Sequence, residues 1–138
     1  MTEAEVFFDT NILLYLLSDD LAKAERAEAL LAAGGVISVQ VLNEFAAMAV
    51  RKLALEWPEI REVLTTVRAV CRVEPVSLAT HERGLAIAER YGLSIYDSLI
   101  VAAAALAGCR ILYSEDMQNG QTIEAVTIRN PFAAPARY

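Results

Sequence analysis

The sequence predicts an α/β fold in which a parallel β-sheet is covered by helices on both faces. Short apolar runs of three or four residues alternate along the chain with longer helical stretches, which is the pattern of repeated strand–helix units. The runs are too uniformly apolar for strands with one face in water, as expected for buried parallel strands. Hydrophobic residues make up 56% of the chain and charged residues 22%, which excludes a disordered or low-complexity protein. With 138 residues, the chain is predicted to form a single domain over residues 1–138.

Five apolar runs are predicted as strands, at residues 6–8, 36–39, 73–76, 110–113 and 126–128. The third run contains Pro75, which lacks a backbone N–H, so we expect this strand near an edge of the sheet. The polar residues 114–121 are predicted to form a loop after the fourth strand.

The intervening segments predict helices at residues 12–17, 21–33, 41–55, 57–70, 81–91 and 94–107. Residues 18–20 (Ser-Asp-Asp) are typical of an N-terminal cap for the second of these, and Gly34 ends it. Pro58 is tolerated in a first helical turn, and Gly92 and Gly108 end the last two helices.

Composition and charge argue against several classes of function. The longest apolar run, residues 99–109, is about half of the roughly 20 residues that a membrane span needs, so it predicts a buried helix. The acidic N-terminus lacks the basic region of a signal peptide, so a cytoplasmic location without membrane contact is expected. Cys71, Cys109 and His81 match no zinc or redox spacing; the thiols are predicted to pack in the core and the histidine to lie at the surface. The net charge of −6 disfavours nucleic-acid binding through overall charge.

Four acidic residues are predicted to approach the carboxyl ends of the strands, where parallel sheets form their sites. Asp9 ends the first strand, and Glu44 lies about a turn into the helix after the second. Asp97 lies in the first turn of the helix before the fourth strand, and Asp116 follows that strand. None has a lysine or arginine beside it in sequence. Singly, each also has a structural interpretation, because Asp9 and Asp97 occupy helix-capping positions and the other two suit solvated positions.

Carboxylates gathered without cations repel each other, and a hard divalent cation such as Mg²⁺ or Mn²⁺ relieves that repulsion. A metal held this way activates water and stabilises a phosphoryl oxyanion. Because no histidine or cysteine is a candidate nucleophile, the predicted reaction is hydrolysis of a phosphodiester by metal-activated water. Thr10, Asn11 and Ser114 are small polar groups suited to orienting ligands or waters, or to ordinary turn and cap hydrogen bonds.

Four segments together resemble the PIN-domain family, and within it the VapC-type toxins of toxin–antitoxin pairs. They are residues 6–11 (Val-Phe-Phe-Asp-Thr-Asn), 41–45 (Val-Leu-Asn-Glu-Phe), 94–100 (Ser-Ile-Tyr-Asp-Ser-Leu-Ile) and 112–118 (Leu-Tyr-Ser-Glu-Asp-Met-Gln). Their order and spacing agree with the family over nearly the whole chain. The resemblance implies a PIN-like three-layer α/β/α sandwich with a parallel sheet of about five strands in the order 3-2-1-4-5. It also implies that the helix bearing Asp97 starts at the acidic edge.

The resemblance further implies a Mg²⁺- or Mn²⁺-dependent endoribonuclease. The family's first three acids correspond to Asp9, Glu44 and Asp97 as metal ligands, and its more variable fourth acid to Asp116, with Glu115 as an alternative. Asn11 corresponds to a supporting polar position of the family, and Thr10 and Ser114 are expected to support the site as neighbouring polar groups. The implied partners are RNA as substrate, a second copy in a homodimer, and a VapB-type antitoxin whose C-terminal tail covers the active site.

Two further interpretations concern RNA contacts. Arg51 follows Glu44 by seven residues, which places both on nearly the same helix face, and Lys52 is adjacent. One hypothesis is that both cations help to grip RNA; an ordinary solvated surface is the more usual role for such residues. Tyr96 is predicted to pack in the core, with stacking on a base as the alternative.

Competing functions remain open at this point. A non-catalytic α/β binding module, or a phosphatase-like domain, would use the acids as caps or as a single metal site. A haloacid-dehalogenase-like phosphatase would need an aspartate where Asn11 stands. A receiver domain would need paired acids after the first strand and a lysine after the last, and the chain's only lysines are Lys23 and Lys52.

Overall fold

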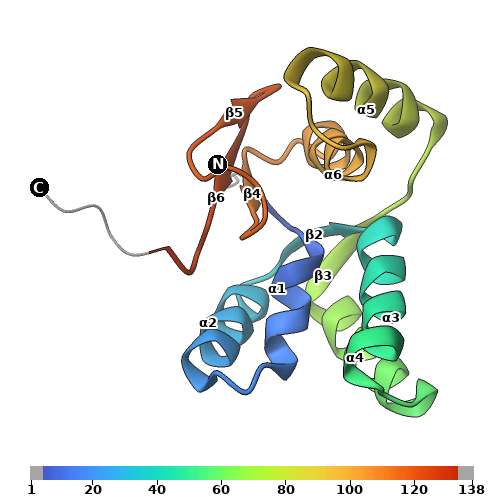
Figure 1. The fold of residues 1–138 in the computed structure, drawn as a ribbon, viewed down its shortest axis with the longest axis vertical. Helices are drawn as coiled ribbons and strands as arrows, with labels where there is room; N and C mark the ends of the chain where they lie inside the picture. The colour runs from blue at the N-terminus through green and yellow to red at the C-terminus, as the bar shows by residue number, and fades with distance from the viewer. Residues whose placement is uncertain (1–4, 134–138) are drawn as a thin grey trace, which may run out of the picture.

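A computed structural model describes residues 5–133 and shows a six-stranded sheet between two layers of helices (Figure 1). The strands lie in the order β3-β2-β1-β4-β6-β5, and all neighbours pair in parallel except β5, which is antiparallel to β6. Their bounds are β1 Val6–Phe8, β2 Gly35–Ser38, β3 Cys71–Glu74, β4 Ile111–Tyr113, β5 Thr122–Ile123 and β6 Val126–Arg129. The predicted α/β sandwich is therefore confirmed.

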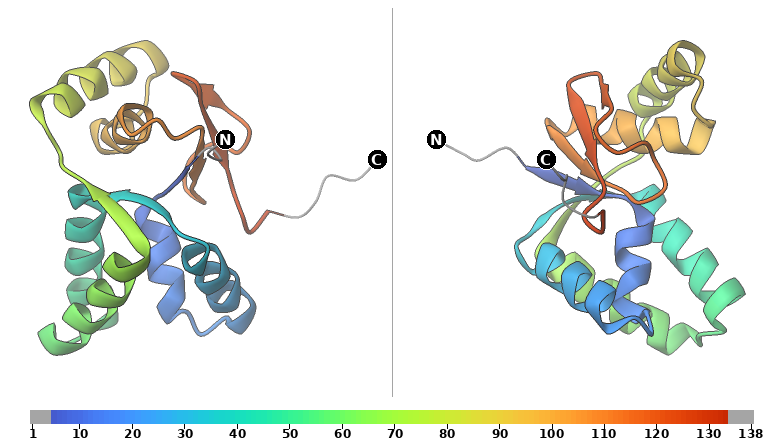
Figure 2. Two further views of the ribbon diagram at one scale, coloured as in Figure 1. Left: turned by 180° about the vertical axis from the view of Figure 1, so that it is seen from behind. Right: turned by 60° about the vertical axis from the view of Figure 1, so that its left-hand side comes forward.

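The helices divide between the two faces of the sheet. Two views show α1 to α4 on one side, and α5 with α6 on the other (Figures 1 and 2). Their bounds are α1 Thr10–Leu14, the 3₁₀ turn η1 Tyr15–Leu17, α2 Leu21–Ala32, α3 Val39–Leu53, α4 Trp57–Val70, α5 Leu78–Tyr91 and α6 Ile95–Leu106. The helix ends follow the local chemistry: the Asp20 side chain caps α2, and Gly92 ends α5 with a φ of +71°.

Several predicted boundaries differ from the structure; for example, α5 begins at Leu78, three residues before the predicted start. β3 begins two residues earlier than predicted, because Cys71 is already extended where α4 ends, and Pro75 lies beyond the strand. Val39 begins α3 instead of ending β2, because the Ser38 hydroxyl caps the helix by accepting from the Val41 N–H. The sheet also has a sixth strand, β5, which the predicted topology lacks. The edge position of β3 and the order of the other strands agree with prediction.

The core lies on both faces of the central strands. Phe7, Phe8 and Leu112 on β1 and β4 are fully buried, and half of the residues of α6 are buried with them. α5 packs closely on α6 because Gly84 has no side chain: a Cβ there would lie 2.6 Å from Leu99 Cδ2. Within residues 5–133, none of the helices has the length and apolar character needed to cross a membrane.

Neither cysteine forms a disulfide. Cys71 and Cys109 are free and buried, and burial raises the pKa of both thiols to about 11, as expected of packing residues. His81 lies on an exposed position of α5. The burial of both thiols and the surface position of His81 agree with the sequence interpretation.

The topology collects chain segments at one edge of the sheet. β1, β2 and β4 are parallel, so their carboxyl ends lie together. α6 runs back across the sheet to feed β4, so the N-terminus of α6 lies at this same edge. Four sequence-distant segments therefore meet there.

Candidate active site

A cavity of about 490 Å³ lies at this edge of the sheet and contains the predicted acids. Its walls come from the start of α1, the middle of α3, the first turn of α6 and the loop after β4. The lining side chains are those of Asp9, Thr10, Asn11, Leu14, Tyr15, Glu44, Ala47, Met48, Arg51, Lys52, Asp97 and Asp116. All four predicted acids thus line one cavity.

Asp9 is the most deeply placed carboxylate, with only 5% of the residue exposed. It caps α1, because its Oδ1 accepts from the Thr10 N–H at 2.7 Å, while its Oδ2 accepts from the Ser114 hydroxyl at 2.7 Å. Burial raises the pKa of Asp9 to about 6; the two hydrogen bonds oppose this shift, and the negative charges of Asp97 and Asp116 add to it. The capping interpretation and the site interpretation therefore both describe this residue.

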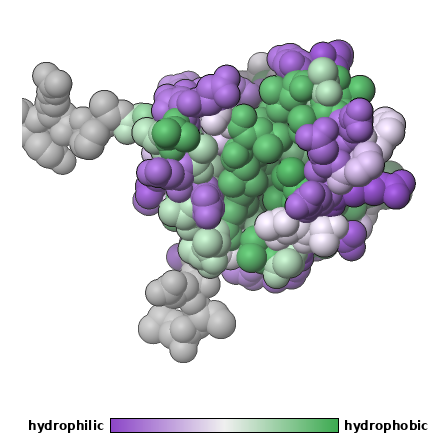
Figure 3. Space-filling model, turned by 90° about the horizontal axis from the view of Figure 1, so that it is seen from below, coloured by the Kyte–Doolittle hydropathy of each residue, from purple (hydrophilic) through white to green (hydrophobic). Residues whose placement is uncertain are grey.

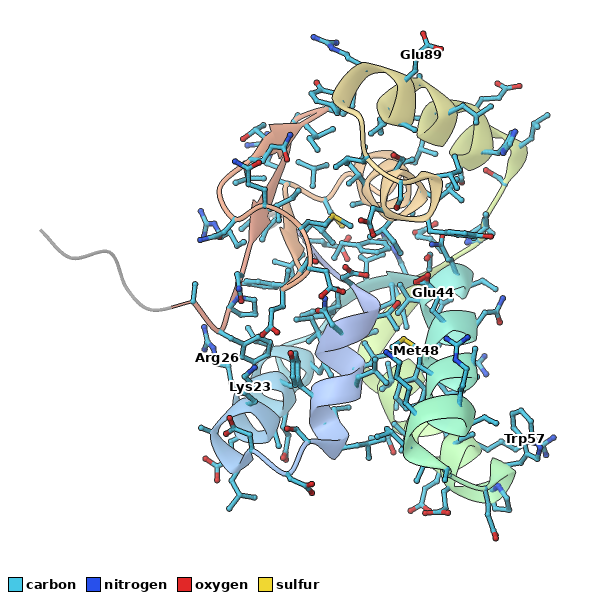
Figure 4. The ribbon with its side chains drawn as sticks, viewed as in Figure 1. Lys23, Arg26, Glu44, Met48, Trp57 and Glu89 are labelled. Carbon is cyan, nitrogen blue, oxygen red and sulfur yellow. The ribbon has the colours of Figure 1, made fainter. Side chains whose placement is uncertain are left out.

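Glu44 lies on α3, where it faces α1 and α6. Its Oε1 accepts from the Thr10 hydroxyl at 2.8 Å, and its Oε2 is 3.5 Å from Gln40 Nε2. The same Gln40 amide donates to the Tyr96 carbonyl at 3.1 Å, which links α3 to the start of α6. Figure 4 shows Glu44 projecting from α3 into the space below α6. Two polar side chains thus hold this carboxylate in place.

Asp97 contributes its backbone to a helix cap and its side chain to the cavity. The Ser94 hydroxyl accepts from the Asp97 N–H at 3.1 Å, which satisfies the first turn of α6. The reciprocal half of the predicted capping box is not formed, because the carboxylate lines the cavity instead. Burial raises the pKa of Asp97, and the negative charges of Asp116 and Glu44 raise it further.

The two adjacent acids after β4 lie in different surroundings. Asp116 is exposed and lines the cavity. The Glu115 side chain is instead paired with Lys23, whose Nζ is 3.3 Å from Oε2, and it also accepts from the Tyr15 hydroxyl. The Glu115 N–H donates to Asn11 Oδ1 at 3.4 Å. The structure therefore places Asp116, and not Glu115, in the cavity.

Arg51 and Lys52 line the cavity at its α3 wall, together with the apolar side chain of Met48. Tyr96, in contrast, is 65% exposed, so its predicted core packing is wrong. The Tyr96 side chain instead lines a surface hollow together with Val39 and Leu99.

Sequence reasoning missed three residues around the cavity: Tyr15, Lys23 and Gln40. Gln40 precedes Glu44 by four residues, a spacing that places two side chains together on a helix and was a usable signal. Tyr15 and Lys23 reach Glu115 across separations of 100 and 92 residues, for which the sequence carries no local signal.

The donor chemistry of the cavity fits a hard divalent cation. The acids offer only carboxylate oxygens, the ligands that Mg²⁺ and Mn²⁺ favour. The raised pKa values of Asp9 and Asp97 mark repulsion and burial that a cation would offset. Within residues 5–133, no group of three or more acidic, histidine or cysteine side chains is already arranged to hold an ion. The fit therefore rests on the donor set, and waters would complete the coordination, as is usual for Mg²⁺.

The fold is an α/β sandwich in which carboxylates from four chain segments meet at the carboxyl edge of the parallel sheet. The sequence model of the PIN domain matches residues 6–119. The chain therefore belongs to the PIN domain family.

Solved structures share this fold at low sequence identity. A toxin–antitoxin complex from Klebsiella pneumoniae matches with a TM-score of 0.71 and 22% identity, covering 94% of this chain and 99% of that one. DNA-bound VapBC from Salmonella typhimurium matches with a TM-score of 0.70 and 17% identity, over 94% and 99% of the two chains. VapC20 of Mycobacterium tuberculosis, described as a sarcin–ricin loop cleaving toxin, matches with a TM-score of 0.63 and 22% identity, over 80% and 89%. A search of curated proteins finds no match.

Proposed function

We propose that this protein is the toxin of a toxin–antitoxin pair and acts as a Mg²⁺- or Mn²⁺-dependent endoribonuclease. The observation that carries the proposal is the convergence of Asp9, Glu44, Asp97 and Asp116 on one cavity of a PIN domain. Two of these carboxylates have raised pKa values, which is typical of acids that are brought together for a function. The similar folds of VapC20 and the Klebsiella pneumoniae toxin–antitoxin complex support the biological role.

In this proposal, the four acids hold the cation, and residues beside them keep the acids oriented. A bound divalent ion supplies an activated water and stabilises charge on the phosphate. The Ser114 hydroxyl fixes one oxygen of Asp9, and the Thr10 N–H fixes the other. The Thr10 hydroxyl holds Glu44, so a single residue couples two of the acids. Such partners outside the coordination shell hold metal ligands in their working orientation.

RNA binding would depend on local positive charge, because the chain as a whole carries a net charge of −6. Arg51 and Lys52 provide that charge on the wall of the cavity opposite the loop that carries Asp116. We propose that they contact phosphates of the RNA strand on one side of the scissile bond. These contacts would contribute affinity without reading sequence.

The proposed antitoxin partner suits an apolar surface that continues from the cavity. Figure 3 shows a broad apolar band on the face viewed from the side of η1 and the α3–α4 connection. A hollow of about 250 Å³ on this side shares Leu14, Tyr15, Met48 and Lys52 with the acidic cavity. A second hollow of about 370 Å³, between η1 and α4, is lined mainly by leucine and valine side chains. A tail with apolar residues followed by a basic residue would cover the band and end at the carboxylates.

A homodimer remains the proposed state of the free protein. Exposed apolar side chains are frequent, and surfaces of this kind mark contacts between proteins. Light scattering after size-exclusion chromatography tests this: about twice the 15.1 kDa chain mass is expected, and a monomer at micromolar concentration would contradict the proposal.

The decisive experiment compares RNA cleavage and Mn²⁺ binding in the unmodified protein and in Asp97→Asn. The unmodified protein should bind Mn²⁺ by calorimetry and cleave RNA only when Mg²⁺ or Mn²⁺ is added. Asp97→Asn should lose both properties while retaining its circular dichroism spectrum. Glu89→Gln is the matched control, because Glu89 is an exposed acid on α5, on the far side of the molecule from the cavity (Figure 4). Retained cleavage by Asp97→Asn would exclude the proposed site, and absent Mn²⁺ binding would favour a non-catalytic binding module.

A further inference from the structure

A polar and aromatic cluster from four separate chain segments lies beside the acidic cavity. Tyr15 comes from η1, Lys23 from α2, Glu115 from the loop after β4, and Phe132 from the segment after β6. Figure 4 shows Lys23 on α2 beside this last segment. Tyr15 also lines the cavity, so the cluster forms part of the cavity wall.

Every member of the cluster contacts at least two others. Lys23 Nζ lies 3.3 Å from Glu115 Oε2 and 3.5 Å from the Tyr15 hydroxyl oxygen, and the Tyr15 hydroxyl donates to Glu115 Oε1. The Lys23 ammonium also lies 4.6 Å from the centre of the Tyr15 ring and 5.7 Å from that of Phe132. The two rings meet edge to face with 4.7 Å between their centres. Both carboxylate oxygens of Glu115 are therefore occupied.

The cluster holds Glu115, the residue directly before Asp116. The Glu115 side chain is held by Lys23 and Tyr15, and the Glu115 N–H donates to Asn11. On the other side of Asp116, the Met117 N–H donates to the Ser114 hydroxyl at 3.3 Å. Asp116 itself is exposed, so its position depends on these flanking contacts.

We propose that Tyr15, Lys23 and Glu115 form a clamp that positions Asp116 for metal binding and keeps Glu115 out of the cation's coordination. The inference rests on the proposed function, since it assigns roles around the same cavity. These are positioning residues, because they act on the site through Asp116. The clamp also explains why one of two adjacent acids lines the cavity and the other does not.

Replacing Lys23 with methionine tests the clamp through the sign of the change in Mn²⁺ affinity. Removing a positive charge near carboxylates should tighten cation binding if charge alone matters. If Lys23 positions Asp116, the same change should weaken Mn²⁺ binding by about 3- to 10-fold, less than the 10- to 100-fold cost of losing a direct outer-shell partner, because Lys23 acts on Asp116 through the neighbouring Glu115. Isothermal titration calorimetry measures this directly. Tyr15→Phe should weaken Mn²⁺ binding less than Lys23→Met does. Lys23→Arg keeps the positive charge, so it should bind Mn²⁺ about as tightly as the unmodified protein.

Two further readouts separate positioning from a general loss of structure. In metal-free protein, hydrogen exchange at the Glu115 and Met117 amides should become faster in Lys23→Met, while exchange in α6 stays unchanged. RNA cleavage by Lys23→Met should recover to within about twofold of the unmodified rate at saturating Mn²⁺, because only the metal affinity is reduced. Arg72→Met is the matched control, since it removes a similarly exposed ion pair, to Glu5 and Glu74, on a different part of the sheet.

Glu115→Gln decides between the clamp and direct coordination. Under the clamp, it should weaken Mn²⁺ binding no more than Lys23→Met does, and the double variant should be no weaker than either single one. If Glu115 is itself a ligand, Glu115→Gln should match Asp116→Asn and Lys23→Met should bind Mn²⁺ more tightly, which would overturn the clamp. Unchanged amide exchange at Glu115 and Met117 in Lys23→Met would overturn the clamp, whether or not the protein binds Mn²⁺. Absence of both Mn²⁺ binding and RNA cleavage in the unmodified protein would contradict the proposed function instead.

Discussion

Two groups of carboxylates lie in opposite electrostatic surroundings: the Arg72 cluster (Glu5, Arg72 and Glu74) and the acids of the cavity. Glu5, just before β1, and Glu74, at the end of β3, each lie 2.8 Å from the Arg72 guanidinium, which also reaches the Ala107 carbonyl. At the carboxyl ends, Asp9 and Asp97 face other acids, and their pKa values are raised. Both groups are carboxylates, but they differ in burial and in neighbouring charge: Glu5 and Glu74 are partly exposed beside a cation, whereas Asp9 is buried near other acids.

The comparison shows that folding disfavours the charged form of an acid in the cavity, whereas Glu5 and Glu74 are paired with the positive charge of Arg72. Burying Asp9 without a cation raises its pKa to about 6, which means that its charged form is disfavoured in the fold. In the proposed function, a bound cation offsets this cost.

Asp9→Asn should produce the largest effect on activity. The substitution removes the deepest of the proposed ligands, and the asparagine side chain can still accept from the Thr10 N–H while the Ser114 hydroxyl rotates to accept. Cleavage of RNA should fall at least about 1000-fold, beyond the 10- to 100-fold cost of losing a group outside the coordination shell. A gel assay with purified RNA measures the rate. Cleavage within tenfold of the unmodified protein would remove Asp9 from the mechanism.

The same substitution should stabilise the protein when metal is absent. In the unfolded chain Asp9 releases its proton near 3.8, whereas in the fold it retains the proton to about pH 6. Between these values the folded state binds more protons, so the contribution of Asp9 to stability falls as pH rises and then levels off above pH 6. The full difference is at most about 3 kcal/mol, at 1.36 kcal/mol for each pKa unit. With EDTA at pH 7, Asp9→Asn should therefore unfold at higher urea concentration than the unmodified protein.

That pH dependence has an internal control. Other carboxylates also titrate, so the informative quantity is the difference in unfolding free energy between the unmodified protein and Asp9→Asn at each pH. This difference should be near zero below pH 4 and should reach its full size by pH 7. A difference that stays constant across this range would show that burial does not raise the pKa of Asp9.

Binding of a divalent metal at the cavity should stabilise the folded protein. A ligand that binds only the folded state stabilises it by about 2.7 kcal/mol at 100 times its dissociation constant. Mn²⁺ should therefore raise the melting temperature of the unmodified protein, more at pH 7.5 than at pH 5, because protons compete for Asp9. Asp9→Asn should show little of this shift. An equal shift in both proteins would place the bound ion elsewhere.

The residues around the cavity also show what the sequence could and could not predict. The order of strands and helices predicts that Asp9 and Glu44 lie at one edge, because they follow parallel strands, whereas the resemblance to the PIN family supplies the position of Asp97. The exposure of Tyr96 had no such signal, because Ile100, one turn further along the same face of α6, is buried. The partner of Glu115 is Lys23, 92 residues away, and such a contact follows only from the packing of α2 against the rest of the fold.

A smaller effect is expected at the cationic wall of the cavity. Arg51→Ala should weaken RNA binding several-fold and reduce the salt dependence of binding by about one released counterion. Fluorescence anisotropy over a range of salt concentrations, with Asp97→Asn as a non-cleaving background, measures both. Arg61→Ala on α4 is the matched control, because Arg61 is exposed and does not line the cavity. An unchanged salt slope would leave Arg51 as ordinary solvated surface.

The smallest effect is expected at the Arg72 cluster, where each carboxylate has a positive partner. Arg72 is about half exposed (48%), and exposed ion pairs contribute little because water screens them. Arg72→Met should therefore lower the free energy of unfolding by less than about 1 kcal/mol, with the stem's packing largely retained. Its Mn²⁺ affinity and RNA cleavage should match those of the unmodified protein. If Arg72→Met instead lowered the free energy of unfolding by as much as Asp9→Asn is expected to raise it, the Arg72 ion pairs would be essential to the fold. The difference between the two groups of carboxylates would then say nothing about function.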